Sequence, residues 1–222
     1  MTEARIVSVR TGRVREWPRP EWDHGERRTW RTAYVKDEVP GPVHAGALGL
    51  EGDEQAHRDV HGGVQMAVLA YAVAHYAKWC EDPALAGMGV GAFGENLALE
   101  GPDESDVCIG DVWETGAVRF AVSQPRGPCA AISRRWNVPD LMQRATESVR
   151  VGWYLRIERE GPVARGEVLR RVARPFPEWT IRRVFRLRIG AEHDPAAALA
   201  LAACAALSPE WRARLADRAA LG

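Results

Sequence analysis

The segment VRFAVSQPRGPC, Val118 to Cys129, carries an apolar run into a proline-interrupted bend that ends in a thiol. Pro125 and Pro128 have no N–H to donate to a sheet ladder, so we expect a strand to end here. A cysteine that only fills a core would sit inside the apolar run. Cys129 instead follows the bend, which predicts an accessible thiol close to Arg126.

Short apolar runs recur on both sides of this segment and are separated by glycine, proline and acidic turns. Repeated short strands are typical of a barrel or a sandwich. We therefore expect a mainly β (α+β) fold, a β-barrel with a few helices. The expected strands are ARIVSVRTG (4–12), two pieces within TAYVKDEVPGPVHAGALGLEGD (32–53), ENLALEG (95–101), IGDVWETG (109–116), VRFAVSQP (118–125), GWYLRIERE (152–160) and EVLRRVARP (167–175).

Helical spacing is confined to a few segments. AVLAYAVAHYAKWCEDP (67–83) places Leu69, Val73, Tyr76 and Trp79 at helical intervals, which predicts one helix. A second helix is expected over 138–145.

The pattern of the sequence changes from strand-like to helix-like after residue 174, where the Pro-rich segment PFPEWT begins. The stretches that follow suit three short helices. Thr180, Asp194 and Ser208 fit N-cap positions, and a proline follows each of the last two directly. The sequence thus predicts a barrel domain over 1–174 and a three-helix appendage over 175–222.

Composition restricts the class of protein. The chain has 222 residues, 46% of them hydrophobic and 27% charged, which is ordinary for a globular protein. No apolar run reaches membrane-spanning length, and the first residues lack the apolar core of a secretory signal. We expect a cytoplasmic location and no membrane partner.

The four cysteines, at 80, 108, 129 and 204, are far apart and form no CxxC pair. This spacing argues against a zinc site or a disulfide framework and predicts reduced thiols. We interpret Cys80, Cys108 and Cys204 as packing residues and Cys129 as the exception.

Charge is distributed unevenly along a chain whose net charge is zero. Residues 36–118 hold 15 acidic and 3 basic residues, whereas residues 119–188 hold 16 basic and 6 acidic residues. The two halves should attract each other. The acidic and basic excesses could form two oppositely charged faces that compensate each other, or the basic excess could form a positive pocket for an anion. The basic excess does not identify a nucleic-acid binder.

Two glycine-rich segments join the thiol bend as candidate site elements. GLEGDEQAHRDVHGG (49–63) would let backbone N–H groups approach a ligand closely, and GAFGENLALEG (91–101) presents Glu95 and Asn96. His57 and His61 are four residues apart, but no HExxH arrangement accompanies them, so we disfavour zinc.

Taken in order, GLEGDEQAHRDVHGG, AFGENL, IGD, VSQPRGPC and RVGWYLR are similar to the YiiM-type branch of the MOSC-domain family, named for the C-terminal domain of molybdenum cofactor sulfurases. The resemblance covers nearly the whole chain. EWTIRRVFRL and LSPEWRARL resemble the three-helix appendage of that branch. The resemblance implies a MOSC-type β-barrel and a molybdenum cofactor (molybdopterin). It implies reduction of N-hydroxylated compounds, including hydroxylamino purines, and no need for pyridoxal phosphate.

The resemblance also implies roles for particular residues. Cys129 would be the thiolate that binds molybdenum, since a soft thiolate suits this metal, and Arg126 would favour the thiolate form. His61 would line the pocket and could exchange a proton. The remaining residues implied in cofactor binding are Lys36, on the expected strand before the Pro-Gly-Pro turn, together with Gly62, Gly63 and Asn96. Asp53 and Glu95 are expected to organise loops or pair with arginines.

Electrons must come from elsewhere, because the sequence has neither a Rossmann fingerprint nor an iron–sulfur cysteine cluster. We expect a separate reductase as partner, a small N-hydroxylated substrate and no nucleic-acid polymer. Two alternatives stay open: a cofactor or sulfur carrier without turnover, and a barrel for another phosphorylated ligand. The Trp-rich EWPRPEWDHGERRTW (16–30) could form a homodimer interface, although its tryptophans could equally be core.

Overall fold

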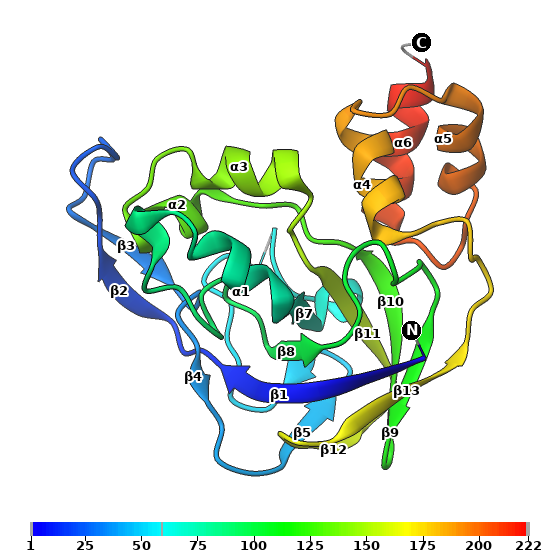
Figure 1. Cartoon of the computed structure of the whole chain (residues 1–222), viewed down its shortest axis with the longest axis horizontal. Helices are drawn as coiled ribbons and strands as arrows, with labels where there is room; N and C mark the ends of the chain where they lie inside the picture. The colour runs from blue at the N-terminus through cyan, green and yellow to red at the C-terminus, as the bar shows by residue number, and fades with distance from the viewer. Residues whose placement is uncertain (1, 59, 221–222) are drawn as a thin grey trace.

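A closed seven-stranded barrel forms the body of the computed structural model, which describes residues 2–58 and 60–220 (Figure 1). The strands are β1 (Glu3–Thr11), β2 (Arg15–Pro18), β3 (Thr29–Thr32), β4 (Asp37–Glu38), β5 (Val43–Gly46), β6 (Gly49–Leu50), β7 (Val68–Ala72), β8 (Leu97–Glu100), β9 (Val112–Thr115), β10 (Val118–Pro125), β11 (Trp153–Arg159), β12 (Gly161–Val163) and β13 (Val168–Ala173). The mainly β fold with a few helices is therefore confirmed.

The barrel closes through its first and last strands. Its order is β13-β9-β10-β11-β7-β8-β1, and β1 also pairs with β13, so each of these strands has two neighbours. All pairs are antiparallel except β7 with β8. The short β4 pairs antiparallel with the end of β1, outside the ring. Strands β12-β5-β6 and the β2–β3 hairpin form small separate sheets. Closure leaves no free edge within the seven-stranded ring.

Six α-helices occur in the described residues, in two groups (Figure 1). They are α1 (Ala74–Trp79), α2 (Ala130–Trp136), α3 (Leu141–Ser148), α4 (Ile181–Ile189), α5 (Pro195–Ala202) and α6 (Pro209–Ala220). One 3₁₀ turn, Val64–Met66, precedes β7, and another, Pro83–Leu85, follows α1. Helices α1 to α3 share a small aromatic core with Tyr71 and Phe93, whose rings stack at 4.3 Å.

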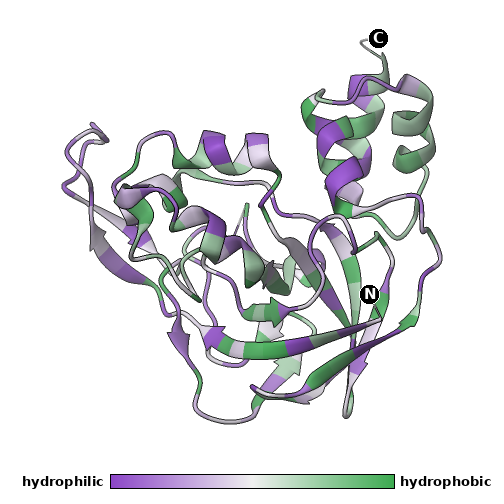
Figure 2. Cartoon of the chain, in the orientation of Figure 1, coloured by the Kyte–Doolittle hydropathy of each residue, from purple (hydrophilic) through white to green (hydrophobic). Residues whose placement is uncertain are grey.

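The C-terminal helices begin at the expected caps. The Thr180 hydroxyl accepts a hydrogen bond from the Arg183 N–H, the Asp194 carboxylate accepts one from the Ala197 N–H, and Ser208 accepts one from the Trp211 N–H. The buried residues of α4, α5 and α6 belong to the same apolar cluster as the barrel interior. The helical group is thus packed on the barrel. In Figure 2, α4 carries both hydrophilic and hydrophobic residues, whereas α5 is hydrophobic along most of its length.

Replacing Thr180 with alanine is expected to lower the free energy of unfolding by about 1 kcal/mol, because the first turn of α4 loses its side-chain acceptor. Serine at this position keeps the hydroxyl and should stay within about 0.5 kcal/mol of the parent. Urea unfolding followed by circular dichroism measures both variants. Equal losses in the two would show that the hydroxyl does not cap α4.

The helix expected over 67–83 is wrong in its first part. Val68–Ala72 forms strand β7, buried along its whole length between β11 and β8, and only Ala74–Trp79 is helical. A strand covered on both faces has a continuous apolar run, so its period cannot be told from that of a buried helix. The helix expected over 138–145 lies slightly later, at Leu141–Ser148, and α2 was not predicted.

The first strand expected within 32–53 is reduced to Asp37–Glu38, and Lys36 precedes it instead of lying on it. The physical reason is a local turn, in which the Thr32 hydroxyl accepts a hydrogen bond from the Tyr34 N–H at 2.9 Å. This turn brings Tyr34 and Lys36 toward the interior.

The acidic and basic halves of the sequence do pair across the fold. Arg174 binds the fully buried Asp111, and Arg144, Arg159 and Arg165 bind carboxylates from the acidic half. None of the helices within residues 2–58 and 60–220 is long and apolar enough to cross a bilayer.

Candidate functional site

A cavity of about 340 Å³ opens where the bend after β10 meets the glycine-rich segment 49–63. Of the predicted site residues, Cys129, Arg126, His61, Gly62, Lys36 and Asn96 line it. The structure thus gathers residues from four separate stretches of sequence at one place. The cavity is also lined by residues that were not predicted as cofactor ligands: Thr32, Tyr34, Asp53, Gln55, His57, Met66, Phe93, Arg134 and Tyr154.

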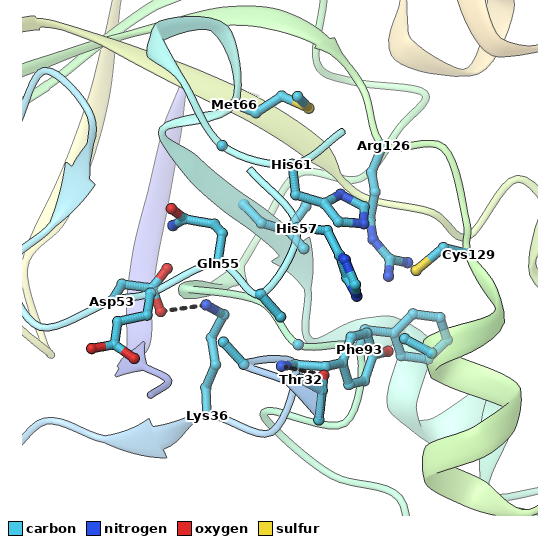
Figure 3. A pocket seen from close by; sticks show the side chains of 18 of the residues that line it. Thr32, Lys36, Asp53, Gln55, His57, His61, Met66, Phe93, Arg126 and Cys129 are labelled. Carbon is cyan, nitrogen blue, oxygen red and sulfur yellow. Dashed lines mark hydrogen bonds and ion pairs between the residues drawn. The ribbon is translucent and has the colours of Figure 1, made fainter. Parts of the chain in front are cut away.

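Cys129 lies at the N-cap of α2, directly after the bend, and its thiol is half-buried. Arg126 is 3% exposed, and its guanidinium and the Cys129 thiol point toward one another (Figure 3). Among residues 2–58 and 60–220, Nη1 of Arg126 has no hydrogen-bond partner although it is buried. A buried cationic donor without a partner is costly, so this N–H group is suited to bind an anionic ligand.

The surroundings of Arg126 keep it charged. Burial acts to lower the pKa of Arg126, but its interactions with Tyr34, Cys129 and Tyr154 outweigh burial and raise that pKa above its ordinary value. Burial in turn raises the pKa values of Tyr34 and Tyr154, against the effect of Arg126. The guanidinium also lies 5.7 Å from the centre of the Tyr34 ring. Arg126 is therefore a fixed positive charge in the cavity, flanked by the neutral phenols of Tyr34 and Tyr154.

On the opposite wall, Lys36 and Asp53 form a buried ion pair (Figure 3). Their side chains are 8% and 4% exposed. Burial lowers the pKa of Lys36, and Asp53 opposes that shift. Asp53 also accepts hydrogen bonds from the Gly12 N–H at 2.7 Å and the Asn96 side-chain amide at 3.0 Å. Asp53 thus organises this wall, as predicted, with a lysine in place of an arginine as its partner.

Asn96 has its polar groups engaged within the fold. Its Oδ1 accepts from the Leu69 N–H, and its Nδ2 donates to the Arg10 carbonyl and to Asp53. Glu95, expected to be presented by the same loop, is fully buried and accepts hydrogen bonds from Tyr76 and from backbone N–H groups. Asn96 thus holds the loop to the barrel, and Glu95 holds the loop to α1.

The histidines lie on the loop between β6 and β7. His57 and His61 border the cavity near Arg126 and Cys129 (Figure 3), and Gly62 has φ 87° with the Gln55 side chain packed against it. Gly63 borders a second, open cavity that also includes His61. Within residues 2–58 and 60–220, no cluster of three His, Cys, Asp or Glu side chains could hold a metal ion.

Several lining residues were missed from the sequence, among them Tyr34, Gln55 and Tyr154. Tyr34 and Gln55 lie on irregular backbone, where the direction of a side chain cannot be deduced from periodicity. Tyr154 follows β11's first residue and could have been found, since β11 pairs with the end of β10 next to Arg126.

The Trp-rich segment 16–30 forms the β2–β3 hairpin and the adjoining turn. Trp30 is buried at the cavity wall, whereas Trp17 lies between the guanidinium groups of Arg15 and Arg135. The homodimer interface stays a prediction.

Comparisons with known proteins agree with this architecture. Residues 57–170 match the model of the MOSC domain, and residues 179–220 match the YiiM-like, 3-alpha helix domain. Protein YiiM of Escherichia coli is 35% identical over 76% of this chain and 72% of its own length. A protein named Reductase from Gibberella moniliformis is 34% identical over 82% of this chain, which spans only 32% of that longer protein. The crystal structure of YiiM from Geobacillus stearothermophilus superposes with a TM-score of 0.78 at 29% identity, covering 97% of this chain and 99% of that one.

Proposed function

Because the chain belongs to the MOSC-domain family and carries a YiiM-like three-helix domain, we propose that it is a molybdenum-cofactor-dependent reductase of N-hydroxylated compounds such as hydroxylamino purines. The name of the Gibberella moniliformis relative supports an oxidoreductase. The cofactor and the substrate class are the proposed part. The observation that carries them is the buried guanidinium of Arg126, whose Nη1 has no hydrogen-bond partner among the described residues, beside the half-buried thiol of Cys129.

The residues of the cavity fit a molybdenum-bearing pterin phosphate. A cysteine sulfur is a suitable ligand for a soft metal, and it loses its proton when it binds the metal. Cys129 places such a sulfur at the cavity wall. The cofactor is anionic, and Arg126 provides a buried positive charge with a free donor. The cavity of about 340 Å³ is in the range of small-molecule and cofactor sites.

We assign Cys129 as the metal ligand, and Arg126 as the main cation for the cofactor. Lys36 has three N–H donors, so it can bind Asp53 and still offer a donor to the cavity. His61 and Gly62 would form the wall, with Gly63 at the adjoining opening. Asn96 would act indirectly, by holding Asp53.

When bound, the cofactor would supply two-electron chemistry that the side chains lack. Reduction of an N–OH group to an amine consumes two electrons and two protons and releases water. The contribution of the chain is to bind and orient the substrate and to deliver protons. The His61 imidazole is suited to this task, because imidazole is the commonest general acid–base group in enzymes.

Electrons would come from a separate reductase, because the described cysteines are four isolated thiols without a cluster arrangement. Unpaired cysteines also suit the reducing cytoplasm, which we propose as the location. The partner class is thus an electron-transfer protein, and the other reactant is a small molecule.

Chemical analysis of the protein purified from a host that makes the cofactor tests the proposal. We expect about one molybdenum and one pterin per chain. Addition of dithionite and 6-hydroxylaminopurine should then yield adenine, detected by chromatography. Protein without molybdenum would overturn the proposal, and loaded protein that forms no amine would indicate a cofactor carrier instead.

A further inference from the structure

The short connection between α3 and β11, residues 149–152, has an unusual backbone. Val149 has φ 53° and Gly152 has φ 77°. A β-branched residue rarely adopts this left-handed conformation, which persists only where the surroundings impose it. At Gly152 a side chain is excluded, because a Cβ would lie 2.4 Å from the Ala70 carbonyl oxygen. Some group must therefore hold this connection in place.

The carboxylate of Glu104 is that group. Glu104 is fully buried, and its Oε1 accepts hydrogen bonds from the N–H groups of Val151 at 2.9 Å and Gly152 at 2.7 Å. Its Oε2 lies 2.6 Å from Nε2 of His75, which is also buried. A carboxylate with three buried partners fixes the position of the connection.

The same connection is bonded to the start of the thiol bend. The Gly152 carbonyl accepts a hydrogen bond from the Arg126 N–H at 3.0 Å, and the next residue, Trp153, pairs with Pro125. Glu104 is therefore linked to the backbone of Arg126 through a single residue, Gly152, and it does not line the cavity. A shift of this connection would move the guanidinium relative to Cys129.

Glu104 is also bonded to the C-terminal helices. Its carbonyl accepts a hydrogen bond from the Arg182 N–H at 2.7 Å, in the first turn of α4, and the neighbouring Ser105 hydroxyl accepts one from Arg182 Nε at 2.7 Å. Glu104 thus links the first turn of α4 to the connection that supports the backbone of Arg126.

We infer that Glu104 is a positioning residue, whose carboxylate holds residues 149–152 so that Arg126 faces Cys129. This role goes beyond the proposed function, because it requires neither cofactor nor substrate. It makes a specific claim about the ligand-free chain: the positive charge beside the Cys129 thiol depends on a carboxylate that does not line the cavity.

The charge beside Cys129 can be measured by alkylation of the ligand-free protein. Iodoacetate is anionic and iodoacetamide is neutral, so the ratio of their rates at Cys129, followed by peptide mass spectrometry, reports the nearby cation. Arg126→Met sets the baseline ratio without that cation. We expect the parent ratio to exceed this baseline at least about fivefold, as one nearby unit charge implies.

Glu104→Ala is expected to lower the ratio to the Arg126→Met baseline while the protein remains folded. Glu104→Gln keeps an oxygen acceptor for both N–H groups and should retain most of the parent ratio. Glu100→Ala removes an exposed glutamate of β8 and serves as the matched control, with no change expected. Loss of stability alone does not alter the preference of a folded thiol for an anionic reagent.

Should Glu104→Ala fail to fold, the ratio of the two alkylation rates in Glu104→Asp tests the inference instead. It keeps the charge, but its side chain is one methylene shorter and cannot reach all its partners, so the ratio should fall below that of Glu104→Gln. A folded Glu104→Ala or Glu104→Asp protein with the parent ratio would overturn the inference.

Discussion

The Cys129→Ser variant is expected to bind no molybdenum and to lose at least about 100-fold of the proposed reductase activity. Loss of groups that merely orient metal ligands already costs about 10–100-fold in affinity or activity, and loss of the proposed metal ligand itself should cost more. Within the described residues, Cys129 is the one cysteine that lines this cavity. Metal analysis and amine formation with dithionite measure the two effects.

Cys80→Ser provides the matched control. Cys80 is also half-buried, but its thiol donates to the Met88 carbonyl, away from the cavity. We expect parent levels of molybdenum and activity in this variant. Full molybdenum content in Cys129→Ser would show that another group holds the metal.

The second large effect is expected on stability, for Lys36→Met. This change leaves the buried Asp53 carboxylate without its counter-ion, and breaking a buried pair in this way costs about 3–5 kcal/mol. Urea unfolding gives the free energy directly. The double variant Lys36→Met/Asp53→Asn removes both charges and should recover most of the loss.

The chain contains one other lysine, which makes a natural control. Lys78 forms an exposed pair with Glu81, so Lys78→Met should change the free energy of unfolding by less than about 0.5 kcal/mol. Similar losses in the two lysine variants would contradict a buried ion pair at Asp53.

The barrel could be predicted because most of its strands are short apolar runs that lie between turn residues. Val118 to Pro125 is an example: the prolines at its end mark where pairing stops. Leu69 shows the limit of this reasoning. It lies on a strand that is covered on both faces, and such a strand has no alternation to read.

The candidate site could be predicted only where its reactive residues lie close together in the sequence. A thiol and an arginine that follow a strand stand out in the sequence, whereas the pairing of Lys36 with Asp53 depends on a fold that brings distant loops together. Glu104 is the extreme case. It sits in the acidic stretch EGPDESD, which looks like a solvated turn, yet its partners come from residues 75 and 151–152.

The closure of the barrel has a consequence for synthesis on the ribosome. β1 is made before both of its neighbours in the barrel, β8 and β13, and the second of these ends at Ala173. At about 5–20 residues per second, β1 must wait roughly 8–32 s before that neighbour exists. During this interval the nascent chain exposes an unpaired edge, which is the type of surface that holdase chaperones protect.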